Sequence, residues 1–196
     1  MNILNKLYLF ILKYFYEKKV FIEKELIVLG KFPHFKLPKN GKVKFGNKVV
    51  INSDFKNSNT ALTYKCKFVT GYDGFIEIGD NTMMNGTCIV SYKNVKIGKN
   101  CQIASSTLIS DTDFHPIDSK TRKAQVEGRP FSFDMVKKDE IKIGDNVWIG
   151  WNSTILKGVQ IGENSVVAAG SVVLRGKYPN NSLIAGNPAK VVKVLD

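Results

Sequence analysis

Histidine and cysteine are scarce in this 196-residue chain, and their scarcity excludes most metal chemistry. The only two histidines are His34 and His115. They cannot supply the three imidazole ligands that a zinc site of the carbonic anhydrase type requires. The three cysteines, Cys66, Cys88 and Cys101, are odd in number and have no CxxC spacing. This pattern predicts reduced, structural thiols and no metal site.

Long apolar runs and acidic residues are also few. The longest uncharged apolar run, Leu7 to Leu12, is far shorter than the ~20 residues needed to span a bilayer, and we expect no cleavable signal peptide. Asp and Glu number 17 against 29 Lys and Arg, a net charge of +12. Such a surface favours acidic partners, namely phosphorylated cofactors, anionic glycans or anionic lipid. Nucleic acid is not expected, because the basic residues form no recognisable binding motif.

A six-residue repeat dominates the second half of the chain. Six consecutive units open with an aliphatic residue, and they begin at Ile143, Ile149, Ile155, Ile161, Val167 and Val173. A period of six belongs neither to a helix nor to an isolated strand, and it indicates a β-solenoid. Three hexapeptides would form one triangular coil, with the opening residue inside and Gly, Asn or Asp at corners that need left-handed backbone angles. The sequence therefore predicts an all-β solenoid.

Weaker copies of the repeat precede this stretch. Further units begin at Ile78, Met84, Ile97 and Ile103, and degenerate units at Phe45 and Ile51. One extra residue between Val90 and Lys96 predicts a bulge or a loop near residues 92–94. We expect N-terminal coils over residues 41–109, C-terminal coils over residues 143–186 and a tail over residues 187–196.

The first 22 residues differ in character. Apolar residues recur at helical spacing among lysines, and they are Ile3, Leu4, Leu7, Phe10, Ile11, Tyr14 and Phe15. The pattern predicts a short N-terminal amphipathic helix over residues 1–22. Two roles stay open for this helix. It either covers the unpaired strand edges at the open end of the solenoid, or places its aromatic face and lysines in an anionic membrane interface.

The repeat is interrupted once, by a long extruded loop over residues 110–142. Loops of this length are usually functional or disordered. His115 lies near its start, and an imidazole can act as a general base near neutral pH. The group that would orient the ring stays open between Asp111, Asp113 and a backbone carbonyl. Lys120 to Lys123 are interpreted as a basic, flexible segment.

Four motifs together resemble the hexapeptide-repeat acyltransferases. They are the repeats themselves, the segment from Ser110 to Ile117, residues 143–150, and Ala185 to Lys190. Within that family the chain is most similar to the acetyltransferases of sugars and surface polysaccharides. The resemblance covers residues 70–193 strongly, residues 41–69 weakly and the N-terminal helix hardly at all.

The resemblance implies a left-handed parallel β-helix assembled as a homotrimer. It implies acetyl-CoA in a groove between two subunits and direct transfer of acetyl to a sugar hydroxyl, with the loop of one subunit reaching its neighbour. It further implies His115 as the catalytic base. Acceptor-binding residues would be Asn85, Asp111 and Asp113. Cofactor-binding residues would be Trp148, Gly150, Trp151, Ala169, Gly170, Arg175 and Lys190.

We therefore expect an acetyl-CoA-dependent O-acetyltransferase, without a metal, that acts in capsule or lipopolysaccharide biosynthesis. The expected location is the cytoplasm, with peripheral contact at the inner membrane face left open. Two alternatives remain. One is an N-acetyltransferase of a nucleotide-linked amino sugar, and the other, of a different class, is a non-catalytic sugar-binding β-solenoid.

Overall fold

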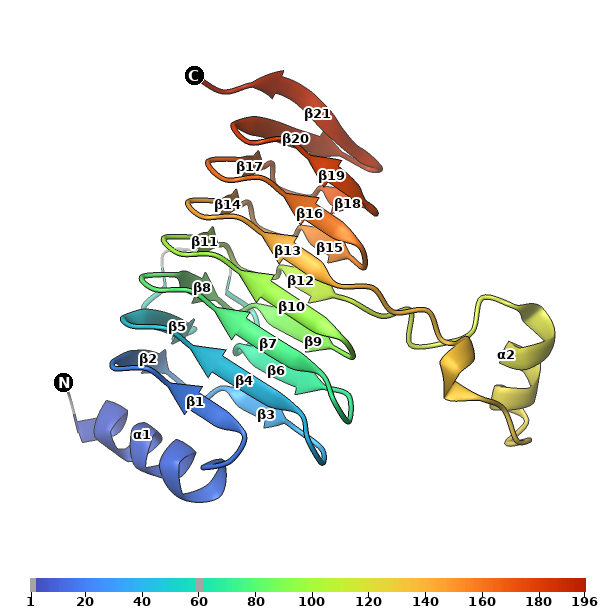
Figure 1. Ribbon diagram of the computed structural model, residues 1–196. Helices are drawn as coiled ribbons and strands as arrows, with labels where there is room; N and C mark the ends of the chain where they lie inside the picture. The colour runs from blue at the N-terminus through green and yellow to red at the C-terminus, as the bar shows by residue number, and fades with distance from the viewer. Residues whose placement is uncertain (1–2, 59–61) are drawn as a thin grey trace.

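The computed structural model describes residues 3–58 and 62–196, and it forms a three-sided parallel β-solenoid (Figure 1). Sheet I contains β1 (Val20–Ile22), β4 (Lys42–Phe45), β7 (Phe75–Ile78), β10 (Asn94–Ile97), β13 (Ile141–Ile143), β16 (Val159–Ile161) and β19 (Gly176–Tyr178). Sheet II contains β2 (Leu26–Gly30), β5 (Val49–Ser53), β8 (Met83–Asn85), β11 (Gln102–Ile103), β14 (Trp148–Ile149), β17 (Val166–Val167), β20 (Ser182–Gly186) and β21 (Ala189–Val194). Sheet III contains β3 (His34–Lys36), β6 (Lys67–Thr70), β9 (Cys88–Ser91), β12 (Leu108–Ser110), β15 (Thr154–Leu156) and β18 (Val172–Val173).

The opening residues of the hexapeptides form the core, as the repeat predicts. On sheet II, for example, Ile103, Ile149 and Val167 occupy successive strands in one register and are almost completely buried. Stiff β-branched side chains stack well in such columns. Each strand pairs in register with the equivalent strands of the coils before and after it. The hexapeptide register therefore determines which side chains point into the solenoid in every coil.

Asparagine forms a ladder at the corner between sheets I and II. Asn146 and Asn164 have φ of 54° and 59°, and the Nδ2 of Asn146 donates to Oδ1 of Asn164 at 3.0 Å. Asn81 and Asn100 repeat this arrangement two coils earlier, at 3.2 Å. The prediction of left-handed corner angles is confirmed for these asparagines, whereas Gly144, Asp145 and Gly162 do not have positive φ. Asparagine is suited to this position because it tolerates that angle and bonds its equivalent in the next coil.

Both ends of the solenoid extend beyond the ranges predicted for it. β1, β2 and β3 form a coil before residue 41, where large apolar residues conceal the hexapeptide register. At the other end, β21 lies within the predicted tail and pairs antiparallel with β20. The sequence pattern underestimated both ends because terminal coils need to match a neighbour on one side only.

The N-terminal helix α1 (Ile3–Phe15) lies across the first coil (Figure 1). It ends seven residues before the predicted limit of residue 22, and residues 1–2 lie outside the described part of the chain. Leu12 is buried, and Tyr8, Leu9 and Tyr16 pack against the solenoid core. Nothing among the described helices is long and apolar enough to cross a bilayer.

Two side chains of α1 form hydrogen bonds with backbone groups at the open edge of β2. The buried Asn5 donates from Nδ2 to the Leu26 carbonyl at 3.1 Å and accepts from the Val28 amide at 2.8 Å. The hydroxyl of Tyr8 donates to the Gly30 carbonyl at 3.0 Å. An edge strand otherwise exposes unpaired backbone groups that attract other chains. The capping role of the helix is therefore confirmed for this face.

Candidate functional site

Residues 111–140 leave the solenoid between sheets III and I and project from its side (Figure 1). The two stems of this loop pair with each other. Thr112 forms an antiparallel bridge with Lys138, and the Asp113 amide donates to the Lys137 carbonyl at 3.0 Å. Beyond the stems lie α2 (Ser119–Val126) and the short 3-10 helix η1 (Phe133–Met135). The stem pairing gives the loop a fixed base.

Asp111 is completely buried where the first stem leaves the solenoid. Its carboxylate accepts hydrogen bonds from the Ser91 hydroxyl (2.9 Å), the Tyr92 amide (2.6 Å) and the Lys93 amide (2.9 Å). Burial raises the pKa of Asp111, and these hydrogen bonds oppose that rise. The residues it holds are those between β9 and β10, where the sequence predicted a bulge. Asp111 thus fastens an irregular turn, and its carboxylate is not turned toward an acceptor.

His115 follows a residue with an unusual backbone. Phe114 has φ of 62°, in the left-handed region, and its ring packs edge-on against Tyr92 with centroids 6.1 Å apart. A bulky residue at positive φ is strained, and such strain is typical of functional sites. The His115 side chain itself is exposed, and its Nδ1 lies 2.9 Å from Oε1 of Gln125.

This contact favours one tautomer of the neutral ring. An amide oxygen only accepts, so Nδ1 carries the proton and donates it to Gln125. In the neutral imidazole, Nε2 is then the unprotonated nitrogen and can accept a proton from a ligand. The orienting group was left open between two aspartates and a backbone carbonyl, and the structure supplies a side-chain amide instead.

Helix α2 carries the residues that hold His115, whereas the sequence predicted a flexible segment there. That prediction is wrong. Asp118 caps the helix, since its Oδ1 accepts from the Thr121 amide at 2.8 Å. Arg122 donates to the carbonyls of Pro116 and Ile117 at 3.1 and 2.6 Å. The N-cap aspartate was a readable helix signal, but the basic composition concealed it.

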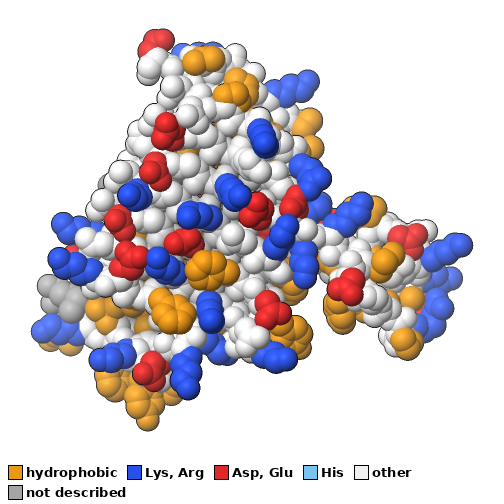
Figure 2. Space-filling view, in the orientation of Figure 1, with side chains coloured by type: hydrophobic (Ala, Val, Ile, Leu, Met, Phe, Trp, Pro, Cys, Tyr) orange, Lys and Arg blue, Asp and Glu red, His pale blue; other side chains and the backbone are white. Residues whose placement is uncertain are grey.

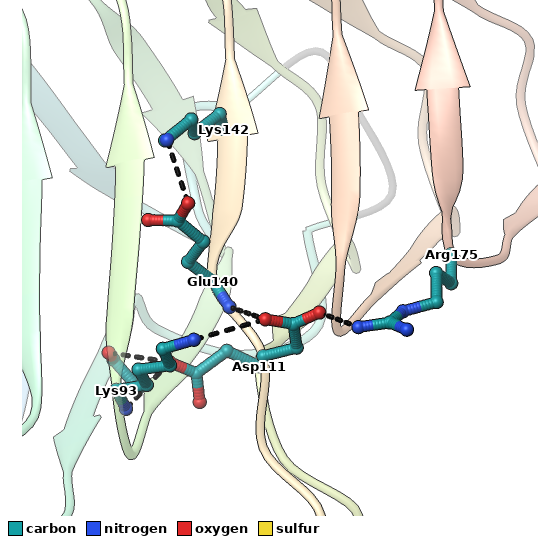
Figure 3. A network of polar contacts seen from close by, with 7 residues as sticks. Lys93, Asp111, Glu140, Lys142 and Arg175 are labelled. Atoms are coloured by element: carbon teal, nitrogen blue, oxygen red, sulfur yellow. Dashed lines mark hydrogen bonds and ion pairs between the residues drawn. The ribbon is translucent and has the colours of Figure 1, made fainter.

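Ion pairs surround the base of the loop. Asp139 accepts from Lys93 at 3.1 Å and also pairs with Arg175, so it joins the turn before β10 to the turn after β18. Figure 3 shows the labelled Lys93 and Arg175 reaching toward the same place from different coils. Asp113 pairs with Lys157, while its second oxygen, Oδ2, is buried without a hydrogen-bond partner. Arg175 was predicted to meet the phosphates of CoA, and here its side chain is exposed and bound to a carboxylate.

The other predicted residues lie along sheet II and its corner with sheet III. Asn85 ends β8 and accepts from Asn52 at 2.9 Å. The Gly170 amide donates to the Trp151 carbonyl at 2.9 Å, which aligns these two corners of successive coils. Trp148 and Trp151 are 53% and 57% exposed, so both rings are available to a ligand.

Two glycines at this corner differ in the space around their Cα atoms. A Cβ on the buried Gly150 would lie 2.5 Å from the Ala169 amide nitrogen, so the close stacking of coils requires glycine there. Gly170 has φ of 70°, and a Cβ there would meet no atom within 4 Å. With the exposed Ala169, it leaves an open strip of backbone. Lys190 extends sheet II, exposed on β21 opposite Ala185.

The predicted site residues therefore form two groups in one chain. His115, Asp113 and Arg175 belong to the corner between sheets III and I. The remaining candidates follow sheet II or its corner with sheet III, and are Asn85, Trp148, Gly150, Trp151, Ala169, Gly170 and Lys190. One chain does not bring the two groups together. Among the described residues, no cluster of His, Cys, Asp and Glu side chains has the arrangement of a metal site.

Comparison with known proteins identifies the family. The family described as "Hexapeptide repeat of succinyl-transferase" matches residues 140–175. A crystallised hexapeptide-repeat containing acetyltransferase from Vibrio cholerae is 33% identical, with a TM-score of 0.56 over 66% of this chain and 68% of that one. The same Vibrio protein has been crystallised with acetyl coenzyme A. The chain belongs to the hexapeptide-repeat acetyltransferases.

Curated relatives from Escherichia coli are similar over a shorter share of their length. Galactoside O-acetyltransferase is 39% identical over 126 residues, which are 64% of this chain and 57% of that protein. A candidate O-acetyltransferase of lipopolysaccharide biosynthesis is 37% identical over 121 residues, which are 61% of each chain. The chain thus spans about 60% of the length of these relatives.

Proposed function

We propose that this protein transfers acetyl from acetyl-CoA to a hydroxyl group of a sugar, with His115 as the general base. One observation carries the proposal. The Oε1 of Gln125 lies 2.9 Å from Nδ1 of His115, a contact that suits a proton on Nδ1 and leaves Nε2 as the basic nitrogen of an exposed ring in the loop over residues 111–140. A general base must lie within reach of the acceptor hydroxyl and be in the right tautomer before its proton affinity can contribute to the reaction.

The reaction follows from this tautomer. Nε2 of His115 removes the proton of the acceptor hydroxyl as its oxygen attacks the thioester carbonyl. The oxygen–carbon bond forms, the carbon–sulfur bond breaks, and the departing thiolate of coenzyme A takes the proton back from Nε2, which restores the neutral imidazole. Gln125 accepts the Nδ1 hydrogen bond throughout and keeps the ring in one orientation. No covalent acyl-enzyme is required.

The candidate cofactor residues suit coenzyme A in their chemistry. Trp148 and Trp151 offer exposed apolar faces, and Ala169 with Gly170 leaves room for a chain to approach the backbone. Lys190 is an exposed cation on the same sheet, and Arg175 is an exposed cation at the loop. Basic side chains bind phosphate through charge-assisted hydrogen bonds. Arg175 would then exchange Asp139 for a phosphate group.

We further propose that the active site lies between copies of the chain, in a homotrimer of left-handed β-helices. Two observations support an intermolecular site. The loop residues and the sheet II residues occupy different corners of one chain, and sheet II exposes Met83 and Trp148 in one outward column. A second copy would cover these apolar side chains and bring its sheet II residues to His115.

The acceptor is proposed to be a sugar of a surface polysaccharide or its precursor, acetylated in the cytoplasm. The similarity to the two Escherichia coli proteins supports a sugar as acceptor, and the net charge of +12 favours an acidic glycan. Asn85 and Asp113 would contact the acceptor.

Calorimetric titration of acetyl-CoA into the purified protein tests the proposal first. Saturable binding near one site per chain, weakened by Arg175→Ala or Lys190→Ala, would support it. His115→Ala should bind acetyl-CoA normally but lose about 10²- to 10⁴-fold in transfer. Offering hydroxyl and amine acceptors separates O-transfer from N-transfer, and acetylation only of amines would refute the O-acetyltransferase assignment. If the folded protein does not bind acetyl-CoA, a non-catalytic sugar-binding solenoid becomes the better explanation.

A further inference from the structure

One face of α1 is not used in capping the solenoid. While Asn5, Tyr8 and Leu12 face the first coil, a second set of side chains on the same helix is 43 to 87% exposed, and it consists of Ile3, Leu4, Leu7, Phe10, Tyr14 and Phe15. Scattered exposed apolar residues need no explanation, but a contiguous set on one helix does.

The apolar surface continues from the helix onto the first coil. Leu4 lines one hollow together with Val28 and Leu29, and Leu29 is itself 40% exposed on β2. Phe21, on β1, is 43% exposed. Figure 2 shows apolar side chains gathered at the N-terminal end of the molecule, with basic side chains beside them. We call the exposed residues of α1, together with Phe21 and Leu29, the terminal patch.

The charge around the terminal patch has one predominant sign. Lys6 and Lys13 lie on α1 and Lys18 follows it, all three exposed, while the helix itself has no acidic residue. Residues 1–40 contain eight lysines and three glutamates, a net charge of +5. One of those glutamates, Glu23, is paired with Lys44 at 2.8 Å.

We propose that the terminal patch docks the protein on an anionic lipid surface. Amphipathic helices with aromatic and aliphatic residues on one face and lysines beside them lie in the plane of a membrane interface. Lysine stems can cover apolar surface while their ammonium groups reach lipid phosphates. The helix α1 has only 13 residues, about 20 Å in length, which suits a position along the interface and not across the bilayer.

A second copy of the chain fits this surface less well than lipid. If two terminal patches met face to face, Lys6, Lys13 and Lys18 of both copies would approach one another at the edge of the contact. Like charges at such an edge repel, whereas the anionic surface of a membrane attracts each of them. The lysines therefore favour lipid as the occupant.

Docking through α1 would orient the whole molecule. The helix lies across the N-terminal end of the solenoid, while the loop that carries His115 projects from the side, several coils further along (Figure 1). The solenoid would stand on the membrane with its loop held clear of the lipid surface. This inference depends only on α1 and the first coil, and it holds whether or not the protein transfers acetyl groups.

Vesicle co-sedimentation of the full chain tests the proposal without any acetyl-CoA. The protein should bind vesicles of phosphatidylcholine with about 30% phosphatidylglycerol, and bind pure phosphatidylcholine vesicles much more weakly. Leu7→Glu with Phe10→Glu should reduce binding by at least about 100-fold, since two large apolar side chains no longer enter the interface. Lys6→Glu with Lys13→Glu should reduce it by at least about 25-fold, at about fivefold for each lysine.

Matched controls lie at the opposite end of the solenoid. Val192→Glu with Val194→Glu changes two exposed apolar residues of β21, and Lys177→Glu with Lys193→Glu changes net charge by the same amount as the helix variant. Both controls should keep wild-type binding. All four substituted pairs are exposed, so unchanged circular dichroism and melting should accompany every result.

Three results would overturn the proposal. The first is wild-type protein that stays in solution with anionic vesicles. The second is a lysine control that loses as much binding as Lys6→Glu with Lys13→Glu, which would indicate general electrostatic attraction. If Leu7→Glu with Phe10→Glu instead lowers the mass measured by light scattering, the terminal patch is an interface between copies of this chain.

Discussion

The imidazole Nδ1 of His115 lies 2.9 Å from the side-chain oxygen of Gln125, which comes from the last turn of α2. Ten residues separate the two in sequence, and the loop folds back to join them. The same helix holds the carbonyls of Pro116 and Ile117 through Arg122. Helix α2 thus positions the proposed base.

Replacing Gln125 should impair catalysis without impairing cofactor binding. In Gln125→Leu the ring loses its hydrogen-bond acceptor, so both its tautomer and its orientation become free. We expect kcat to fall about 10- to 100-fold, part of the contribution of a general base, while the Kd for acetyl-CoA stays unchanged. Steady-state kinetics and calorimetry on the same preparation measure both quantities.

Gln125→Glu distinguishes a positioning role from a merely structural one. A carboxylate would still accept from Nδ1 but would also stabilise the protonated ring, so the acidic limb of the kcat/KM pH profile should move to higher pH. A structural role would leave the profile unmoved. If Gln125→Leu and the wild type have equal kcat, Gln125 does not position the base.

Asp111 should contribute to stability. In Asp111→Asn one carboxylate oxygen becomes an NH2 group, which donates and cannot accept. The backbone amide of Tyr92 or of Lys93 then loses its acceptor. The free energy of unfolding should fall by about 1 to 3 kcal/mol, which lowers Tm by several degrees. The exposed Asp134→Asn, in the same loop, serves as control in thermal denaturation. Equal Tm for both variants would contradict the structural assignment.

Asn5 should protect the first coil from local unfolding. Asn5→Ala removes the partners of the Leu26 carbonyl and the Val28 amide at the edge of β2. We expect hydrogen exchange at Val28 to accelerate by about tenfold or more, with exchange in β14 to β17 unchanged. Lys6→Ala, an exposed neighbour, is the control. Unchanged protection of Val28 would show that the cap is dispensable.

Cys66 should make stability depend on pH in the alkaline range. Burial raises the pKa of its thiol to about 11. Because the folded state holds the proton more tightly than the unfolded state, this contribution is fully present below about pH 8.5 and is lost as pH rises toward 11, about 3 kcal/mol in all. Urea unfolding of the wild type and Cys66→Ala at pH 8, 9 and 10 isolates it. Parallel pH profiles for the two proteins would contradict the prediction.

The regular coils could be predicted from the sequence because the six-residue pattern that specifies them is local and repeated. Ile149 and Val167 open their hexapeptides and are buried, and Asn146 and Asn164 follow at the corners with left-handed angles. Each copy of a unit confirms the register of the others. The first coil, which includes Phe35 on β3, does not repeat the hexapeptide pattern. The sequence therefore provided no register for it, and it was missed.

The loop shows where this kind of inference stops. Its position was evident from the interruption, and His115 was evident from its rarity. Gln125 carried no signal, because an amide in a polar segment is ordinary until the chain folds back onto it. Asp111 was predicted to bind the acceptor, yet its side chain is buried and accepts hydrogen bonds from residues 91–93.

The sequence by itself determined the solenoid, the interruption after residue 109 and the rare histidine within it, since a repeat of six and an aliphatic column follow from the spacing of residues alone. It missed a second, shorter interruption between β5 and β6. Only the tertiary structure decided which amide orients His115, which carboxylates are already paired, and which face of α1 caps the edge of β2. Those relations join residues that are distant along the chain. Their energies depend on distances and burial that exist only after the coils have stacked.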